Sequence, residues 1–392
     1  MKKAVEQNPI FKCHGLTLVV LMWTTMSWAD VVLTVGGDLN LAQSNHTPFP
    51  DQACKNGRCY SWSQVFSGLE PLLTGELNFF NLETTLTDGR PPLSPQAGKY
   101  VFRTHLEGIR YAQSIGLNWA SLANNHIGDY GQEGMIETIE SVETLNREAS
   151  PMHFHGLART REEILKPTII DFMSLSEGRV RIAFAAVTFV RNAPIPVGED
   201  KPGVIYPENE RDMNELLKNM RNADVDFRVL SIHWGTERQV ELNSGQQSRY
   251  HKYLQKGDVD LILGHHPHRV RPVERVGDRL IFYSLGNYLM LGAESLNRNT
   301  VEHNYGLMGR LYLKRHTSGQ LKIRYVEAIP LFNVHVQSYA LKDEEARSHI
   351  EALNDLSFRE LGTSAVNWLS LPNGWGGTCF SNCREVQIVP LF

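Results

Sequence analysis

The sequence has 392 residues, enough for one large domain or two of ordinary size. Hydrophobic residues make up 42% and charged residues 21%, which is typical of a globular protein rather than a disordered or membrane-embedded chain. The formal net charge of −4 argues against a broad nucleic-acid-binding surface, so no nucleic-acid partner is expected.

The first 29 residues have the layout of a secretory signal peptide. Basic residues precede an uncharged run over residues 15–26, and Ser27-Trp28-Ala29 places small residues at the −3 and −1 positions of a cleavage site. The run is shorter than the roughly 20 residues that a transmembrane helix needs. Cleavage after Ala29 is therefore predicted, with an uncleaved membrane anchor as the alternative. The chain is expected to be exported, to the periplasm or the cell surface.

Four cysteines follow the predicted cleavage site: Cys54, Cys59, Cys379 and Cys383. An even number of cysteines in an exported chain predicts disulfides, and two local pairs are the simplest connectivity. A bridge between the two clusters remains open. A zinc site is the third option, although neither spacing is Cys-x-x-Cys.

Strand-like and helix-like segments alternate along the chain. Strands are predicted over 31–37, 76–83, 117–126, 179–190, 227–235, 260–266 and 279–287, and helices over 107–115, 134–146, 211–222 and 248–257. This alternation predicts an α/β domain with a largely parallel sheet, and the later strands without helices predict mixed pairing. Residues 309–315 and 320–331 are expected to close the domain as an antiparallel pair. We predict a main domain over 30–340 and a C-terminal appendage over 341–392, with a polar helix at 342–360 and one of the cysteine pairs.

Polar side chains follow six of the predicted strands. Ligands of open α/β sheets bind beyond the carboxyl ends of the strands. Buried carboxylates and imidazoles are costly unless they are paired or bound to metal. We therefore predict a site for divalent metal, with Zn, Mn, Fe or Mg all compatible, over a purely structural cluster. The residues at these ends are Asp38, Asn81, Glu83, Asn124, Asn125, His126, His233, His265, His266, His268 and Asn287.

Three histidines lie close together in the segment GHHPH, residues 264–268. Alternate residues of a strand point to the same side. If the strand persists, His266 and His268 would reach one metal pair together, and His265 would face elsewhere. The following Arg269 and Arg271 could form a local basic patch for an anionic polymer.

Six segments, in order, resemble the CapA family of poly-γ-glutamate capsule synthesis proteins, which are similar to calcineurin-like metallophosphoesterases. The segments are GGDLNL, NLETTL, ANNHIGDYG, HWGTE, GHHPHRVRPVE and YSLGNY, between about residues 31 and 287. The resemblance implies a four-layer α/β/β/α sandwich with mixed sheets and a dinuclear metal centre at one edge. It also agrees with export, because this family works outside the cytoplasmic membrane.

The resemblance also implies roles for individual residues. The metal ligands would be Asp38, Glu83 (where related enzymes have a bridging aspartate), Asn125, His233, His266 and His268, with Asn81, His265 and Asn287 as further candidates. Metallophosphoesterases usually have Asp-x-His in the first motif, Gly-Asp in the second and Gly-His-x-His in the last. Here the first reads Asp-Leu-Asn, the second Asn-Leu-Glu, and the last carries an inserted residue. These departures leave the number and identity of the metals open, with two as the expectation.

Three residues are candidates for catalysis. His126 resembles the histidine that protonates a leaving oxygen, and Asp129 could orient its imidazole. Arg103 could supply a charged fork for a phosphate or carboxylate, or equally form a surface salt bridge. Two functions remain open at this point. The chain is either an exported metal-dependent phosphoesterase of envelope or capsule polymer biosynthesis, or a non-catalytic accessory protein that binds or passes an anionic polymer, with a membrane synthesis complex as a candidate partner.

Overall fold

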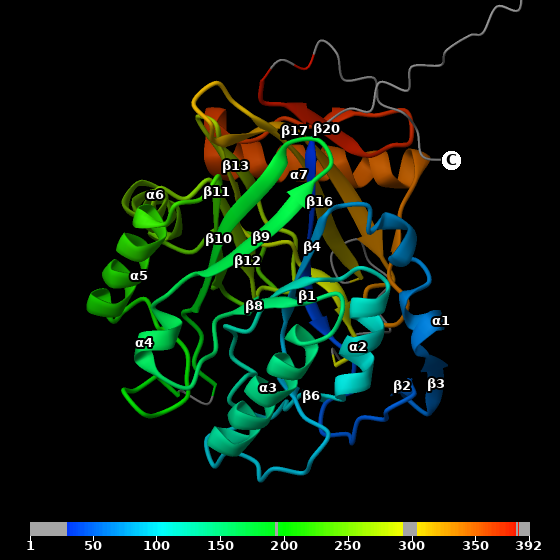
Figure 1. Cartoon of the computed structure of the whole chain (residues 1–392). Coiled ribbons are helices and arrows are strands. Elements are labelled where there is room, and N and C mark those ends of the chain that lie inside the picture. Colours follow the sequence, from blue (N-terminus) through cyan, green and yellow to red (C-terminus); the bar gives the residue numbers. More distant parts are fainter. Residues whose placement is uncertain (1–29, 193–194, 293–303, 382, 384–392) are drawn as a thin grey trace, which may run out of the picture.

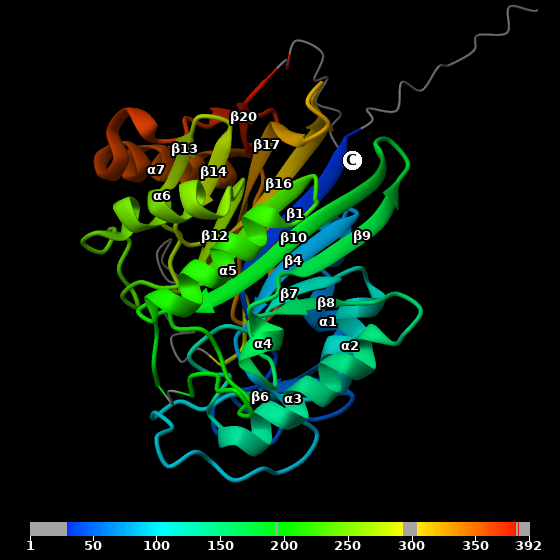
Figure 2. The same cartoon turned by 60° about the vertical axis from the view of Figure 1, so that its left-hand side comes forward.

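Two β-sheets stack face to face at the centre of this computed structural model, which describes residues 30–192, 195–292, 304–381 and 383 (Figures 1 and 2). The predicted signal peptide lies outside these ranges. Within them, no helix is both long and apolar enough to cross a bilayer.

The larger sheet has ten strands. Its main path runs β19 (Leu369–Ser370), β20 (Gly376–Cys379), β17 (Leu321–Phe332), β16 (Tyr305–Arg315), β1 (Val31–Asn40), β4 (Leu77–Leu82), β7 (Trp119–Ser121) and β8 (His153–His155), with β15 (Asn287–Met290) pairing β1 and β18 (Tyr339–Ala340) pairing β17. Strands β4, β7, β8 and β15 belong to its parallel half, whereas β16 and β17 form the predicted antiparallel pair.

The second sheet has six strands in the order β13 (Val273–Val276), β14 (Arg279–Phe282), β12 (Leu261–His265), β11 (Phe227–His233), β10 (Gly178–Thr188) and β9 (Thr168–Ser174). Its central strands are parallel, and β9 and β13 are antiparallel at the edges. Both sheets are therefore mixed. Two short ladders complete the strands: β2 (Gln52–Lys55) with β3 (Arg58–Ser61), and β5 (Thr85–Leu86) with β6 (Arg103–Thr104).

Three hydrophobic clusters define the layers. The central cluster contains side chains of both sheets, such as Phe79 and Trp119 from the larger one and Phe184 and Leu263 from the smaller one. Helices α1 (Trp62–Phe66), α2 (Leu106–Ser114) and α3 (Gly131–Asn146) share a second cluster with the outer face of the larger sheet. Helices α4 (Arg161–Ile164), α5 (Glu210–Asn222) and α6 (Gln246–Gly257) cover the smaller sheet. The predicted four-layer α/β/β/α sandwich is confirmed.

The buried face of α3 includes Met135, Ile139 and Val142, whereas Ile136 is 40% exposed. One local prediction needs correction. The single strand predicted over 279–287 is two strands in different sheets. β14 ends at Phe282, and β15 starts at Asn287 beside β1. The chain thus crosses between the sheets here, which brings Asn287 opposite Asp38.

The C-terminal segment is joined to the main sheet. After α7 (Asp343–Leu361) and the short η2 (Gly362–Ser364), β20 pairs with β17, and Trp368 and Trp375 are buried. Residues 341–381 therefore extend the sheet and its core, instead of forming the expected appendage. Their helix lies across one end of both sheets (Figure 1).

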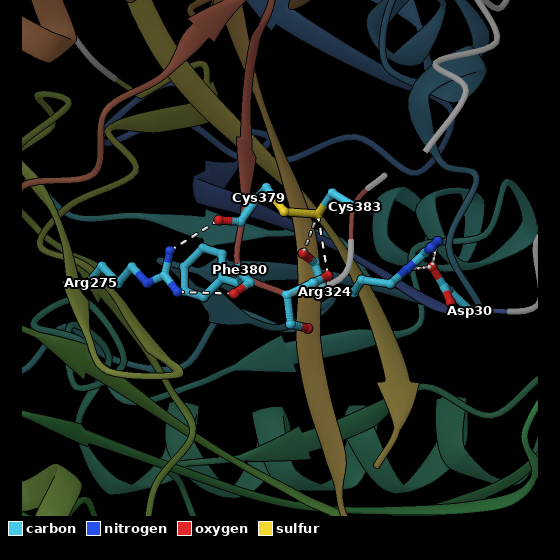
Figure 3. The surroundings of a disulfide bond; sticks show 7 residues. Asp30, Arg275, Arg324, Cys379, Phe380 and Cys383 are labelled. Carbon is cyan, nitrogen blue, oxygen red and sulfur yellow. Dashed lines mark hydrogen bonds and ion pairs between the residues drawn. A yellow bond between two sulfur atoms is a disulfide. The ribbon is translucent and has the colours of Figure 1, made fainter. Parts of the chain in front are cut away.

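Both disulfides are local, as the simplest connectivity predicted. Cys54 and Cys59 are paired across the β2–β3 ladder, and Cys379 is bonded to Cys383 at the end of β20. Arg275 holds this second bridge: its guanidinium donates to the carbonyl oxygens of Cys379 and Phe380, each at 3.0 Å, and lies over the Phe380 ring (Figure 3). The end of the described chain is thereby fixed to the smaller sheet.

Candidate metal centre

The carboxyl ends of β1, β4, β11 and β12 meet at one end of the sandwich. In the larger sheet, Asp38 lies opposite both Asn81 and Asn287. In the smaller sheet, His233 lies opposite His265. Because parallel strands end at the same edge and the two sheets are stacked, polar residues from six separate segments converge on one buried cluster.

Asp38 is fully buried at the centre of this cluster. Its carboxylate accepts hydrogen bonds from the Asn81 amide at 2.8 Å and from the backbone N–H of His266 at 3.3 Å. The Nδ1 atoms of His268 and His265 lie 3.3 Å and 3.4 Å from its oxygens. Burial alone would raise the pKa of Asp38, but the contacts with His265 and His268 outweigh it and hold the pKa well below its ordinary value. Asp38 is therefore a carboxylate in this site.

Glu83 is also fully buried, yet both of its carboxylate oxygens lack a hydrogen-bond partner. The nearest imidazole nitrogens are Nε2 of His233 at 3.5 Å and Nε2 of His268 at 3.7 Å. Burial, followed by the charge of Asp38, raises the pKa of Glu83 well above its ordinary value. A buried carboxyl group without hydrogen-bond partners is uncommon in native proteins, and this one has the chemistry of a cation ligand.

Two groups of potential ligand atoms share Glu83. One consists of Glu83, His233 and His266, and the other of Asp38, Glu83 and His268; within each, the atoms lie within 4.8 Å of one another. A carboxylate common to two neighbouring groups is the arrangement that a bridging ligand of two ions requires. The donor set of carboxylates and neutral imidazoles suits a divalent transition metal. The residues present therefore fit a dinuclear metal centre.

The histidine segment reaches the cluster by a different route from the one predicted. β12 ends at His265, and His266 and His268 have φ of 97° and 54°, in the left-handed region that non-glycine residues seldom adopt. Both still face the cluster, but through a strained loop rather than through strand alternation. The expectation that His265 faces elsewhere is wrong, because its Nδ1 lies 3.4 Å from Asp38.

The imidazoles differ in protonation. Burial lowers the pKa of His233 well below its ordinary value and lowers that of His266 to about 3, so both are neutral and have lone pairs for a metal. For His268, burial would lower the pKa, but the hydrogen bond and charge of Asp38 outweigh it and raise the pKa. Its Nδ1 also lies 2.8 Å from the amide oxygen of Asn287.

Two asparagines complete the first layer around the histidines. The side-chain oxygen of Asn125 lies 2.6 Å from Nε2 of His233, and the Asn81 amide lies 3.3 Å from its Nδ1. Asn124 instead donates to the carbonyl of Leu82 and holds the loop that carries Asn125. The structure thus brings together all nine residues predicted as definite or further metal ligands.

His126 and Asp129 form a pair at the wall of the adjoining cleft. Nδ1 of His126 lies 2.8 Å from Oδ2 of Asp129, which also accepts from the backbone N–H of Phe102 at 2.8 Å. Asp129 is fully buried, and His126 is 4% exposed. The carboxylate fixes the imidazole with Nδ1 toward Asp129, which leaves Nε2 for the cleft. This is the arrangement expected of an oriented proton donor.

Of the three arginines predicted as candidates for the site, two lie away from it. Arg103 donates to the carbonyl of Gly89 and the hydroxyl of Thr47, and its guanidinium lies 5.6 Å from the Tyr130 ring centroid, so it does not join the cluster. Arg271 is fully buried and donates to backbone oxygens and to Asn243, which removes it from any basic patch. Of the two arginines in the histidine segment, only Arg269 lines the cleft.

The cleft beside the cluster has a volume of about 80 Å³, and its wall includes His126, His268 and Asn287. Tyr100, Glu237 and Arg238 also line the cleft and were not predicted from the sequence. Glu237 and Arg238 come directly after the HWGT segment, so their closeness to a motif was the available signal. Arg238 brings a positive charge to the mouth of a site that is otherwise rich in carboxylates.

A family model described as "Bacterial capsule synthesis protein PGA_cap" matches residues 32–291, about two thirds of the chain. This chain belongs to that family. The resemblance seen in the six segments is thereby confirmed. The matched range contains every residue of the cluster described above.

Curated relatives of this family member are distant. The PGA biosynthesis protein CapA of Bacillus subtilis is 24% identical over 250 residues, which are 64% of this chain and 61% of that protein. The capsule biosynthesis protein CapA of Bacillus anthracis is 25% identical over 47% of this chain and 42% of its own length. A probable polyglutamine synthesis accessory protein of Mycobacterium tuberculosis is 24% identical over 58% of this chain and 59% of its own. The chain thus spans less than two thirds of these relatives.

Solved structures that resemble this family member have low sequence identity to it. A calcineurin-like phosphoesterase of Bacillus subtilis covers 84% of this chain and 98% of its own, with 13% identity and a TM-score of 0.42. A hypothetical protein of Thermus thermophilus covers 75% of this chain, with 14% identity and a TM-score of 0.39. TM-scores this low support no conclusion about activity.

Proposed function

We propose that this chain is an exported, metal-dependent phosphoester hydrolase that acts in the biosynthesis of a capsule or other envelope polymer. The observation that carries the proposal is Glu83, a fully buried carboxylate whose two oxygens have no partner and which is shared by two groups of potential metal ligands. Family membership supplies the biological setting. The substrate would be a phosphoester of the polymer or of a lipid-linked precursor.

The residues that would hold the metals are the five of the two groups, Asp38, Glu83, His233, His266 and His268, together with Asn125. Asn81, His265 and Asn287 lie around them. Two divalent ions would supply Lewis-acid stabilisation of phosphoryl oxygens and a lowered pKa for an attacking water. The metals would be Zn, Mn, Fe or Mg, and the donor set does not select among them.

The protein itself would supply orientation and proton transfer. His126 lines the cleft with Nε2 toward it and would donate a proton to the leaving oxygen. Asp129 would fix the ring and stabilise its protonated form, since the carboxylate lies 2.8 Å from Nδ1. Arg238, at the mouth of the cleft, would attract an anionic substrate.

Export is part of this proposal. Two disulfides agree with an oxidising compartment, and the relatives whose printed names include capsule biosynthesis agree with a place at the cell envelope. The predicted signal peptide, residues 1–29, would direct the chain there. A membrane synthesis complex would be its partner.

The first test is the metal content of the mature protein, measured by mass spectrometry per chain. We expect between one and two transition-metal ions, and their loss in a His266→Ala/His268→Ala variant. The matched control is His46→Ala/His316→Ala, two exposed histidines outside the cluster, which should keep the metal. Protein without metal even after reconstitution with Mn or Zn would contradict the proposal.

A second candidate is a non-catalytic accessory protein that binds or passes an anionic polymer. The printed name of the Mycobacterium tuberculosis relative favours it, and so do Arg238 and Arg269 in the cleft wall. The two candidates separate in one comparison. Hydrolysis of bis(p-nitrophenyl) phosphate with Mn would favour the enzyme. Binding of poly-γ-glutamate without any turnover would favour the accessory protein.

A further inference from the structure

A buried arginine joins two of the segments that border the metal cleft. Arg271 follows the histidine segment, and its side chain is fully buried. Its guanidinium donates to the backbone carbonyl oxygens of Thr236 at 3.2 Å and Gln239 at 3.1 Å. It also donates to the side-chain oxygens of Asn243 at 2.9 Å and Gln246 at 3.1 Å. All four acceptors lie in the loop that connects β11 to α6 or in the first residue of that helix.

This β11–α6 loop, residues 234–245, packs against the histidine segment. The backbone N–H of Arg238 donates to the carbonyl oxygen of Pro267 at 2.8 Å. Gly235 has φ of 142°, and a Cβ atom there would lie 2.8 Å from a guanidinium nitrogen of Arg271 and 2.7 Å from the Pro267 ring. A glycine at this position therefore leaves room for the guanidinium. The hydrogen bonds of Arg271 thus hold backbone carbonyl groups that lie in no helix or strand.

The positive charge of Arg271 is not balanced by its hydrogen-bond partners. All four acceptors are neutral oxygens, and a buried cation with such partners is costly. Burial lowers the pKa of Arg271 to about 10, so at neutral pH the guanidinium stays protonated and keeps all of its N–H donors. The planar guanidinium presents these donors in a fixed fork, which the ammonium group of lysine cannot do. The side chain is therefore suited to fixing several oxygens of an irregular loop at once.

The β11–α6 loop carries Glu237 and Arg238, which line the metal cleft. Arg238 has φ of 65°, in the left-handed region, so its place depends on the contacts that hold the loop. We propose that Arg271 is a positioning residue, which fixes the β11–α6 loop so that Arg238 is held at the cleft for an anionic group. The contact of Arg238 with an anion rests on the proposed function, whereas the fixing of the loop is carried by the hydrogen bonds of Arg271. Because Arg271 is fully buried, it would act through Arg238 and not on the anion itself.

The first test is limited digestion of the full mature chain with trypsin, because Arg238 is exposed and trypsin cleaves after arginine. Arg271→Met should speed cleavage after Arg238 at least about tenfold, which corresponds to the loss of one or two net hydrogen bonds that keep the loop closed. Arg271→Lys should have a similar effect, since it keeps the positive charge but loses the fork. Asn243→Ala removes one acceptor at a half-buried position and is a milder variant of the same contact, which should speed cleavage about threefold.

Arg228→Met is the matched control. Arg228 lies at the opposite end of β11 from His233 and is also buried. It donates to three backbone carbonyl oxygens, those of Met220, Arg221 and Ala223. Its loss should lower the Tm but leave the rate of cleavage after Arg238 unchanged at temperatures well below the Tm. Equal acceleration in Arg228→Met and Arg271→Met would mean that both act through global stability, and the positioning role would be wrong.

The second test is the affinity for inorganic phosphate, measured by calorimetry with and without Mn. Arg238→Ala and Arg271→Met should each weaken phosphate binding about tenfold, the range of one hydrogen bond to a charged group, and the double variant should bind no more weakly than either. Metal content should stay unchanged in all three variants, because neither residue is among the predicted ligands. Phosphate binding with this pattern but without any turnover would contradict the proposed hydrolase and still support the positioning role. Effects that multiply in the double variant, cleavage after Arg238 that stays slow in the Arg271 variants, or no phosphate binding by the wild type would overturn the inference.

Discussion

Glu83→Leu should change the stability of the protein in opposite directions with and without metal. In metal-free protein the substitution removes a buried carboxyl group whose two oxygens have no hydrogen-bond partner. In metal-loaded protein it removes the carboxylate shared by both groups of potential ligands. The sign of the effect therefore reports whether the cluster exists to bind metal.

The magnitudes follow from the contacts. Each of the two oxygens without a hydrogen-bond partner lowers the stability of the wild type by about 1–3 kcal/mol. Imperfect packing of the leucine is expected to offset about 1–3 kcal/mol of the stability that the variant gains. Metal-free Glu83→Leu should thus be more stable than the metal-free wild type by roughly 1–3 kcal/mol. Metal at 1,000 times its dissociation constant would stabilise the wild type by about 4.1 kcal/mol. The variant should not gain this, so with metal it should be the less stable of the two proteins.

The assay is urea unfolding of chelator-treated protein, with and without added Mn or Zn. The control is Glu274→Leu. Glu274 is equally buried, but it accepts from Gln247, His251, Tyr283 and Ser364 at 2.7–2.9 Å. Glu274→Leu leaves these four donors without an acceptor and should lower the free energy of unfolding by about 3–5 kcal/mol with and without metal. If Glu83→Leu destabilises metal-free protein as much as the control does, the carboxylate is structural and the reasoning fails.

Three further outcomes are expected. His126→Asn and Asp129→Asn should lower kcat for a phosphodiester about 10²–10⁴-fold while metal content stays unchanged, and loss of metal would assign the pair to the ligand sphere instead. Burial raises the pKa of Asp260 to about 7, so the cost of ionising this carboxyl group in the folded protein grows as pH rises from about 4 to 7. Asp260→Asn should therefore stabilise the protein by about 2–3 kcal/mol more at pH 8 than at pH 5. Urea unfolding at both pH values measures this difference. His155→Phe removes the acceptor of the Ala186 N–H, a 2.9 Å bond between the two sheets, and should lower the free energy of unfolding by about 1–3 kcal/mol; unchanged stability would show that the sheets are held by apolar packing alone.

The mixed α/β sheet and the cluster were predictable from strand periodicity, whereas the four layers followed from the family resemblance. Strands of apolar residues ending in Asp38, Glu83 or His233 identify a buried sheet edge whatever the connections are. The connections between the strands were harder to predict. The crossing between sheets at residues 283–286 occurs within an apolar run that reads as one strand, and only pairing with β1 shows that Asn287 belongs to the other sheet.

The least predictable residues were those placed by a left-handed backbone and those brought together from distant parts of the chain. The alternation rule put His266 and His268 together for the wrong reason, since both have positive φ, at a cost of about 1–3 kcal/mol each. Arg103 was a candidate for the site, with a surface salt bridge as an equal alternative, and its contacts lie outside the cluster. The pairing of β20 with β17 could not be predicted, because no alternation pattern in the C-terminal segment connects it to a strand so far back in the chain.

Glu83 and Glu274 show why partners, rather than burial, identify a functional carboxylate. Both lie in segments that resemble the family, and both are fully buried. Glu274 has four donors, and their hydrogen bonds join α6 and η2 to the smaller sheet. The other has none, and it lies beside Asp38 in a site where the backbone is also strained. A carboxyl group without hydrogen-bond donors and two histidines with positive φ at one place both lower the stability of the metal-free protein, and a bound cation would offset this cost, which is the physical reason to expect one.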